Sequence, residues 1–507
     1  MSRRWWVIGA VALVMALFVG WSAAQGGPGF PLDDGWIHQT YARSLARNGR
    51  WEYTPGVVSA GSTSPLWTML LALGYVLHLP YLLWAFVLGG LSLLWLAWAG
   101  MQLWRLLWPD FADRDWLAGL TLVLTWPLVW SAASGMETIL FAALGLQIAA
   151  LYGRTAVQDE SPDWKAVAVL GFLSGLLILT RPDGVVLVLL VGVGLLLLPG
   201  SWRQRVLAGV VFAALTAVPL LPYFAFNLSA SGSIWPNTFY AKQAEYQALL
   251  ARPLPVRFIS LLYFSWGGPA AGWRGISSAH LLLLPGVIVA GWQALAADWR
   301  SRLLVRTLPL WWAGGHVLLY AWRLPVVYQH GRYLFAALPI WVLYGLAGWL
   351  WLLGRLGNGC QARILKQAAG LTFGLLLLLF LLLGAQSYAA DVAFIEGEMV
   401  DAAHWLAANT PPDALIAAHD IGAIGYFAER PLLDLAGLVS PEIIPLLTDE
   451  SSLAAYVRAS GARYLVTAPG WEYLNLTTDP EVQLVYSTDF AWTEAQGVNG
   501  TAVFKLP

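Results

Sequence analysis

Long apolar segments recur along the first 390 residues of the chain, and they constrain the fold more than any other feature. Most of them approach the 17–25 residues that a helix needs to cross the hydrocarbon core of a bilayer. They lie at 5–24, 80–104, 116–133, 137–153, 165–180, 182–199, 204–226, 279–297, 304–322, 332–353 and 367–388. Only 11% of the residues are charged, whereas soluble domains carry about 25%. The sequence therefore predicts a mainly α-helical, polytopic membrane bundle with about 11 spans.

Basic residues predict the orientation of the bundle, because short cytoplasmic loops are rich in Lys and Arg. Three loops carry such residues, namely Arg203 and Arg205, then Arg300, Arg302 and Arg306, then Arg355, Arg363 and Lys366. With these loops in the cytoplasm, the segments 25–64, 227–278 and 323–331 and the C-terminus lie outside. Arg3 and Arg4 place the N-terminus inside. The apolar run that follows exceeds the 7–15 residues of a signal-peptide core, so we expect a retained helix, with a cleaved signal peptide as the alternative.

A shorter apolar stretch at 65–78 tests this topology. If it crossed the membrane, every later loop would change sides and the basic loops would face outward. We therefore expect 65–78 to be a helix at the outer membrane surface, within a first outer loop that covers 25–79.

The composition changes near residue 390, where charges and prolines return and the long Leu runs end. The segment "EMVDAAHWLAANTPPDA" has the pattern of an amphipathic helix, and "ALIAAHD", "ARYLVTAP", "VQLVYST" and "GTAVFKL" have the pattern of short strands. A tail of this length suffices for a small domain with its own core. We predict a membrane domain over 1–389 and an extracytoplasmic α/β domain over 390–507.

Several classes of function lack support in the sequence. The net charge of −1 gives no reason to expect a nucleic-acid partner. The single cysteine, Cys360, has no neighbouring Cys or His with which to form a metal motif. The patterns H-E-x-x-H and G-x-x-x-x-G-K-[ST], which mark zinc proteases and nucleotide hydrolases, are absent.

The unusual polar residues fall mainly on the predicted outer side, which indicates a single outward-facing site. Ionisable groups at a membrane boundary are costly and usually serve a function. The candidate catalytic carboxylates are Asp33, Asp34 and Glu137. The candidate binding residues from the same loops are His38, Arg181, Asn237, Lys242, His330, Arg332 and Tyr333.

Each of these residues also has a structural interpretation. Asp33, Asp34 and Glu137 can cap helices, because acidic side chains favour helix N-termini. Arg181 and Arg332 can anchor helices at the membrane interface. His38 and His330 fit packing or hydrogen-bonding roles more simply than metal binding.

Motifs spread along nearly the whole chain resemble those of the polytopic C-type glycosyltransferases (GT-C), which use sugars linked to polyprenyl phosphate. The stretch "LDDGWIHQTYARSLARNGRWEYTPGVVSAGSTSPLWTMLLA" resembles their first outer loop, and its Tyr-Ala-Arg helix adds Tyr41 to the candidate binding residues. The stretches "SGMETILFAAL", "LSGLLILTRPDGVVLVL", "PNTFYAK", "HGRYLFAALPI" and "HDIGAIGYFAERPLLDLAGLVSPE" resemble further family segments. The likeness is greatest to mycobacterial terminal arabinofuranosyltransferases and related bacterial membrane proteins. One departure is Gln39, near which the family often has an Arg.

The resemblance implies a multi-pass protein of the bacterial plasma membrane that moves a sugar from a polyprenyl-phosphate donor to an extracytoplasmic glycan, lipid or protein acceptor. An aspartate of the outer loop would act as general base on the acceptor hydroxyl. Arg181, Lys242 or Arg332 would stabilise the phosphate that leaves. Glu137 would bind sugar hydroxyls, raise the pKa of the base, or share a divalent metal with the aspartates, so the cofactor requirement stays open.

Three other functions remain open at this point. The long 227–278 loop leaves room for transfer of a whole lipid-linked oligosaccharide by a ligase or transferase. A flippase or transporter of polyprenyl-linked sugars would also have many spans, but its charges would lie within helices along a central path. A non-catalytic scaffold with the same fold is the third.

Overall fold

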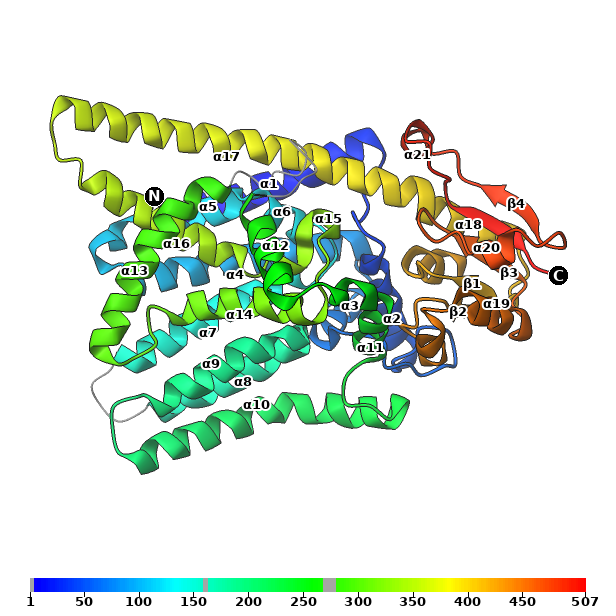
Figure 1. Ribbon diagram of the computed structural model, residues 1–507, viewed down its shortest axis with the longest axis horizontal. Helices are drawn as coiled ribbons and strands as arrows, with labels where there is room; N and C mark the ends of the chain where they lie inside the picture. The colour runs from blue at the N-terminus through cyan, green and yellow to red at the C-terminus, as the bar shows by residue number, and fades with distance from the viewer. Residues whose placement is uncertain (1–3, 158–162, 268–279) are drawn as a thin grey trace.

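The computed structural model describes residues 4–157, 163–267 and 280–507, and it shows an elongated helical bundle with a small sheet at one end (Figure 1). The bundle contains α1 (Arg4–Gln25), α4 (Tyr81–Leu107), α5 (Asp115–Leu124), α6 (Trp126–Ala132), α7 (Thr138–Val157), α8 (Trp164–Thr180), α9 (Val185–Leu196), α10 (Trp202–Ser231), α12 (Leu254–Gly267), α13 (Leu284–Ser301), α14 (Leu308–Arg323), α15 (Tyr328–Gly331), α16 (Leu338–Gly354) and α17 (Cys360–Ile395). Three shorter helices, α2 (Asp34–Asn48), α3 (Pro65–Val76) and α11 (Asn237–Glu245), lie between the bundle and the sheet.

Six helices of the described chain are long and apolar enough to cross a membrane. They are Trp5–Gln25, Tyr81–Leu107, Thr138–Val157, Trp202–Ser231, His280–Ser301 and Cys360–Asn409. The pair Tyr328–Leu334 and Leu338–Gly354, bent by 77°, gives a seventh if it forms one broken span. The protein is therefore a multi-pass membrane protein, although fewer helices meet this standard than the 11 or so spans expected from apolar length.

Helix breaks explain the difference in the number of spans. The expected span at 116–133 is two helices, α5 and α6, separated at Thr125, where ψ is 102° just before the proline-containing first turn of α6. Pro127 has no backbone N–H to donate to the carbonyl four residues earlier in α5, so a helix that continued through it would lose a hydrogen bond. The expected spans at 165–180, 182–199 and 304–322 are helices of 17, 12 and 16 residues.

Helix α3 corresponds to the stretch that we expect at the outer surface. It has 12 residues, so its length is about 18 Å at 1.5 Å per residue, against a hydrocarbon core of about 30 Å. The indole nitrogen of Trp67 donates to the carbonyl of Gly135 at 2.7 Å, which holds α3 on the bundle. Its position at the membrane surface stays a prediction.

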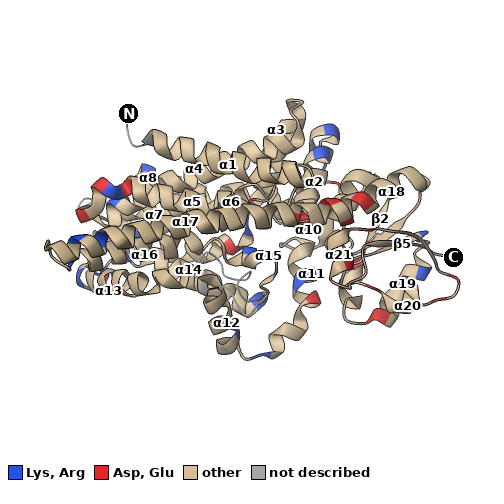
Figure 2. Ribbon diagram, turned by 90° about the horizontal axis from the view of Figure 1, so that it is seen from above, with Lys and Arg blue, Asp and Glu red and all other residues tan. Residues whose placement is uncertain are grey.

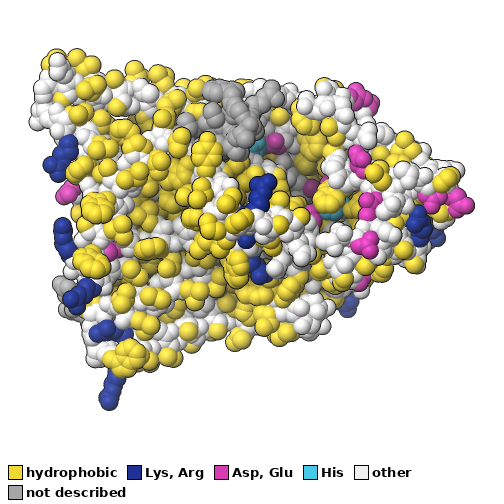
Figure 3. All heavy atoms as spheres, viewed as in Figure 1, with side chains coloured by type: hydrophobic (Ala, Val, Ile, Leu, Met, Phe, Trp, Pro, Cys, Tyr) yellow, Lys and Arg dark blue, Asp and Glu magenta, His cyan; other side chains and the backbone are white. Residues whose placement is uncertain are grey.

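Charged residues occupy the two ends of the long helices, with a smaller group inside near α15 (Figure 2). The surface between the ends is largely hydrophobic (Figure 3). The loops that carry the basic clusters at 203–205, 300–306 and 355–366 lie at the end opposite the sheet (Figure 1). This distribution suits a body that is surrounded by lipid along its length.

The C-terminal region is a five-stranded mixed sheet with helices around it. Its strands are β1 (Ile416–Ala418), β2 (Leu432–Asp434), β3 (Tyr464–Thr467), β4 (Gln483–Ser487) and β5 (Ala502–Lys505), in the order β2-β1-β3-β5-β4. Strands β2, β1 and β3 are parallel, whereas β5 is antiparallel to β3 and β4. The helices are α18 (Asp401–Asn409), α19 (Glu450–Ala459), α20 (Leu474–Thr477) and α21 (Ala491–Ala495).

Alternation along β1 gives the sheet two buried faces, because successive strand residues point to opposite sides. Ile416 and Ala418 pack in a cluster with Tyr41 and Tyr53 of the first outer loop. Ala417 packs on the other face, in the cluster that contains α19. One face of the sheet is thus fixed against the loop that carries the acidic pair.

The sequence patterns found four of the five strands and α18, but they missed β2. Strand β2 has only three residues, and the last of them is the charged Asp434. A run this short gives no periodic signal. The division into domains at residue 390 stays a prediction, because α17 continues without a break through a π-helical turn (Glu396–Val400) into α18.

Candidate functional site

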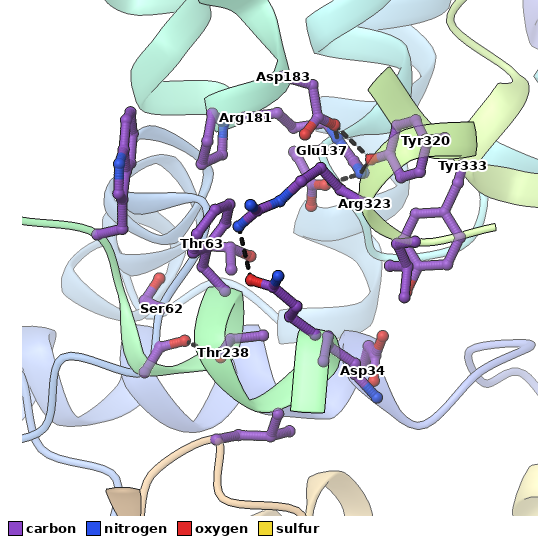
Figure 4. Close-up of a pocket in the computed structure, with 18 of the residues that line it drawn as sticks. Asp34, Ser62, Thr63, Glu137, Arg181, Asp183, Thr238, Tyr320, Arg323 and Tyr333 are labelled. Carbon is purple, nitrogen blue, oxygen red and sulfur yellow. Dashed lines mark hydrogen bonds and ion pairs between the residues drawn. The ribbon is translucent and has the colours of Figure 1, made fainter. Parts of the chain in front are cut away.

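A cavity of about 360 Å³ lies where the bundle meets the short helices and the C-terminal region (Figure 4). Its walls come from the start of α2, the loop at 61–63, the turns at 136–137 and 181–185, α11, the end of α14, residues 332–333 and residues 438–439. Seven of the residues singled out in the sequence line it, namely Asp34, His38, Glu137, Arg181, Lys242, Arg332 and Tyr333. Segments far apart in the sequence therefore contribute to one polar cavity.

A buried ion-pair network forms one side of the cavity (Figure 4). Arg181 donates from Nη1 to Glu137 at 2.8 Å, from Nε to Asp183 at 2.9 Å and from Nη2 to the hydroxyl of Tyr320 at 2.6 Å. The Arg181 side chain is only 13% exposed. Its guanidinium is thus committed to protein partners, and its charge is already balanced by two carboxylates.

The carboxylate of Glu137 lies between an arginine and a histidine. One of its oxygens accepts from Arg181, and the other lies 3.2 Å from Nε2 of His38. Burial alone would raise the pKa of Glu137, but the hydrogen bond from His38 and the charge of Arg181 outweigh it and lower the pKa to about 2. Glu137 is therefore ionised and held in place.

Asp34 forms an ion pair with Arg332 on the opposite side of the cavity. Asp34 is the first residue of α2, and its side chain is 32% exposed, compared with 2% for Glu137. Burial would raise the pKa of Asp34, but Arg332 and then Lys242 lower it to about 2. Nε and Nη1 of Arg332 are buried without a hydrogen-bond partner among the described residues, so two guanidinium donors remain for a ligand.

Asp33, the other member of the acidic pair, does not line the cavity, and its prediction as a catalytic residue is not supported by its contacts. Its carboxylate accepts from the backbone nitrogens of Gly422 at 2.6 Å and Ala423 at 2.7 Å. Burial, and then the charge of Asp420, raise the pKa of Asp33 to about 7 in spite of these two bonds. Asp33 holds the C-terminal region onto the first outer loop, and it makes no side-chain bond that caps α2.

Three further predicted binding residues also lie outside the cavity. Tyr41 is fully buried and donates to the hydroxyl of Ser59 at 2.9 Å. Asn237 is buried at the start of α11, where its backbone nitrogen donates to Ala60 at 2.9 Å. His330 has a left-handed backbone, with a φ of 61°, which directs its side chain away from the cavity. Its Nε2 lies 2.8 Å from the carboxylate of Asp391, and its ring packs against two Trp rings.

Two cations extend the positive side of the cavity. Lys242 of α11 forms an ion pair with Glu245 at 3.3 Å. Burial would lower the pKa of Lys242, but the charge of Glu245 outweighs burial and raises it. Arg323, at the end of α14, donates to Gln243 at 2.7 Å and lies over the ring of Phe239, with 4.5 Å from Cζ to the ring centroid. Sequence reasoning missed Arg323, although an Arg that ends an apolar helix on the outer side was a usable signal.

The sequence left a divalent metal at the acidic residues open, and the donor set does not fit one. No group of three or more His, Cys, Asp or Glu within the described ranges is placed to hold a metal ion. One oxygen of Glu137 accepts from Arg181 and the other faces the imidazole of His38, and Asp34 is paired with Arg332.

Residues 387–502 match a family model described only as a domain of unknown function (DUF8728). No curated protein matches the chain. Among solved structures, the fold is similar to ArnT from Cupriavidus metallidurans bound to undecaprenyl phosphate, with a TM-score of 0.60, 17% identity, and 99% of this chain and 98% of that chain covered.

Two structures of an archaeal enzyme are also similar. The Archaeoglobus fulgidus oligosaccharyltransferase tethered to an acceptor peptide has a TM-score of 0.61 at 12% identity, with 92% of this chain and 69% of that chain covered. The oligosaccharyltransferase AglB of the same organism, in complex with an inhibitory peptide and a dolichol-phosphate, has a TM-score of 0.57 at 12% identity, with 91% and 69% covered. The chain therefore has a GT-C-like fold, a mainly helical polytopic bundle followed by a mixed sheet, which resembles membrane glycosyltransferases that use polyprenyl-phosphate sugars.

Proposed function

We propose that the protein is a membrane glycosyltransferase that moves a sugar from a polyprenyl-phosphate donor to an acceptor outside the plasma membrane of a bacterium. The observation that carries the proposal is the pairing of a partly exposed carboxylate, Asp34, with the cations Arg332, Lys242 and Arg323 in one cavity. Transfer from a lipid phosphate needs both a base for the acceptor and positive charge for the leaving group. The GT-C-like fold supports the same proposal.

Asp34 is the general base in this proposal. The acceptor oxygen attacks the anomeric carbon of the donor and gives its proton to the Asp34 carboxylate, while the bond between that carbon and the phosphate oxygen breaks. The electron pair stays on the phosphate, and polyprenyl phosphate leaves. Asp34 suits this role better than Glu137, because Glu137 is almost fully buried and is bound by Arg181.

Arg332 links donor binding to the strength of the base. A low pKa makes Asp34 a poor base while Arg332 is its partner. A donor phosphate that accepts from the unpaired Nε and Nη1 of Arg332 shares the guanidinium charge. The pKa of Asp34 then rises toward the range in which a carboxylate removes protons effectively.

The Arg181 network has a positioning role. It fixes Glu137, Asp183 and Tyr320 in one rigid group beside the cavity. Carboxylates held in this way can accept hydrogen bonds from sugar hydroxyls and orient the ring before transfer. Asp183, which lines the cavity and has a side chain that is 19% exposed, is thus proposed to bind the sugar, whereas the buried Glu137 holds Arg181 in place.

The topology is proposed with the basic loops in the cytoplasm, which puts the cavity and residues 390–507 outside. The concentration of Lys and Arg at the end opposite the sheet supports this orientation (Figure 3). A glycan, lipid or protein acceptor would then reach the cavity from the extracytoplasmic side, and the donor would reach it from the bilayer. The likeness to arabinofuranosyltransferases stays a prediction for the sugar.

The test has two parts. Mass spectrometry of lipids that copurify with the protein is expected to find a polyprenyl phosphate or its glycoside. The purified protein in nanodiscs is then given a panel of polyprenyl-phosphate pentoses and hexoses with an envelope glycan fraction. Sugar transferred to the glycan supports the proposal, whereas transfer only from a lipid-linked oligosaccharide, or movement of the lipid across the bilayer without transfer, would replace it.

A further inference from the structure

The C-terminal region reaches the cavity directly. Leu438 and Val439 line it, on a turn whose backbone nitrogens at Ala436 and Val439 donate to the buried carboxylate of Asp434. Gly437 in this turn has a φ of 73°, a left-handed conformation that glycine adopts at little cost. Part of the region that matches only a domain of unknown function is therefore a wall of the proposed donor site.

A second connection runs through charged side chains. Lys242, which lines the cavity, lies 3.3 Å from Oε2 of Glu245 on the same helix, α11. Oε1 of Glu245 faces Nε2 of His419 at 3.6 Å, across the interface with the C-terminal region. Nδ1 of His419 lies 3.1 Å from the carboxylate of Asp420. A cation in the cavity and an imidazole of the C-terminal region thus share one carboxylate.

The surroundings of His419 favour its charged form. Its ring stacks on Trp471, with 3.8 Å between the ring centroids and 16° between the planes. Burial would lower the pKa of His419, but the hydrogen bond with Asp420 and the nearby carboxylate of Glu245 raise it to about 9. The imidazole is therefore protonated at neutral pH, and Glu245, whose side chain is 3% exposed, lies between two cations.

We propose that the C-terminal region sets the charge of the donor site, because His419 shares the Glu245 carboxylate with Lys242 and so leaves more of the Lys242 charge for the donor phosphate. The proposal rests on the proposed function in taking a lipid phosphate as the ligand. With His419 protonated, the group of His419, Asp420, Glu245 and Lys242 has no net charge, and without that proton it carries −1. Without that proton, Glu245 neutralises Lys242 and competes with the phosphate for it. His419 is a positioning residue in this scheme, since it acts through Glu245.

The experiment measures binding and does not depend on transfer. Full-length protein in nanodiscs is titrated with a short-chain isoprenyl phosphate and, separately, with the uncharged isoprenyl alcohol. His419→Gln is expected to weaken phosphate binding about tenfold, the usual effect of one charge-assisted hydrogen bond, and to leave alcohol binding unchanged. Equal weakening of both ligands would mean a general structural defect and would overturn the proposal.

Variants of Glu245 distinguish an electrostatic effect of His419 on Lys242 from an effect of packing around His419. Glu245→Gln is expected to tighten binding of the isoprenyl phosphate, because Lys242 loses its competing anion. In the Glu245→Gln background, His419→Gln should have little further effect. The coupling of His419 to Lys242 through Glu245 would be contradicted by weaker phosphate binding in Glu245→Gln. It would also be contradicted if His419→Gln weakened binding as much in the Glu245→Gln background as in the wild type.

The control is His404→Gln, at an exposed position of α18 within the same region, where the imidazole contacts the ring of Phe427. This variant should bind the isoprenyl phosphate as the wild type does. Wild-type protein that fails to bind the isoprenyl phosphate would contradict the proposed donor and the inference together. Wild-type binding that His419→Gln leaves unchanged would overturn the inference alone.

Discussion

Asp34 and Arg332 form an ion pair across 298 positions of sequence, and this pair joins the start of α2 to the turn that precedes α16. The adjacent carboxylate of Asp33 points elsewhere, to the backbone of Gly422 and Ala423. Two neighbouring acids thus have separate tasks, one in the cavity and one at the interface with the C-terminal region. Single substitutions can therefore distinguish them.

The Asp34→Asn variant tests the proposed base. Asn keeps the size of the side chain but cannot remove a proton, so transfer should fall by about 10²–10⁴-fold, the range for a positioned general base. Binding of an isoprenyl phosphate should persist, because Arg332 loses its competing carboxylate. The measurements are the transfer rate in nanodiscs and the binding constant. Transfer at the wild-type rate would remove Asp34 from catalysis.

The Asp33→Ala variant tests the interface. It leaves two buried backbone N–H groups without acceptors, and each such loss costs about 1–3 kcal/mol. Hydrogen exchange at Gly422 and Ala423 should become much faster, and the C-terminal region should be cleaved more readily by protease. Asp33→Asn keeps one carbonyl acceptor and should have a smaller effect. Unchanged exchange in Asp33→Ala would contradict this role.

The Arg181→Lys variant tests the buried network. A lysine keeps the charge but cannot donate simultaneously to Glu137, Asp183 and Tyr320 in the geometry of a guanidinium. We expect transfer to fall by about tenfold or more, the scale of one lost charge-assisted bond. Arg154→Lys is the matched control, since Arg154 is exposed and donates only to Gln102 among the contacts described. Equal activity of both variants would count against the network.

The stability contributed by His419 should depend on pH. Its pKa is about 9 in the folded protein, above the usual 6.5, so protonation stabilises the fold. That contribution should be complete below about pH 6.5 and should be lost as the pH rises through 9. The charged groups that face the imidazole are Glu245, Asp420 and Asp434. The measurement is the difference in unfolding free energy between wild type and His419→Gln at several pH values, and a difference that does not vary would contradict the assignment.

The Gly61→Ala variant tests the cavity wall. A Cβ atom at Gly61 would lie 2.6 Å from the carbonyl oxygen of Leu438 and 2.6 Å from the hydroxyl of Tyr41. We expect the turn at 438–439 to move away from the first outer loop and donor binding to weaken. Gly49→Ala would not be a matched control, because Gly49 has a φ of 68°. Gly9→Ala in α1 meets nothing within 4 Å and should leave binding unchanged.

Charge and apolar length were sufficient to predict the general arrangement. The positive loops fix which polar residues share a side, and this grouping anticipated that Asp34, Glu137, Arg181 and Lys242 would meet in one cavity. The residues of this set lie on segments whose ends are held at one boundary of the bundle. Proximity of that kind follows from topology alone.

The orientation of individual side chains was not predictable in the same way. Asp33 and Asp34 are consecutive, and consecutive residues of a helical turn point in directions about 100° apart. Which of them faces the cavity depends on Gly422, 389 residues later. His330 was misplaced because its left-handed backbone turns it toward Asp391. Such reversals depend on tertiary packing, of which the local sequence carries no signal.

The uninterrupted helix Cys360–Asn409 has 50 residues, about 75 Å at 1.5 Å per residue, which exceeds the 40–45 Å of a whole bilayer with its headgroups. This helix runs along one edge of the bundle, where it packs on α1 and α6, and it is continuous with α18 (Figure 1). It therefore limits the motion of the sheet relative to the bundle. The π-helical turn at Glu396–Val400 is the one irregular place along it. If the C-terminal region moves to open the cavity, the motion should therefore be a small bend at the π-helical turn. Such a bend would displace the sheet without separating it from the bundle.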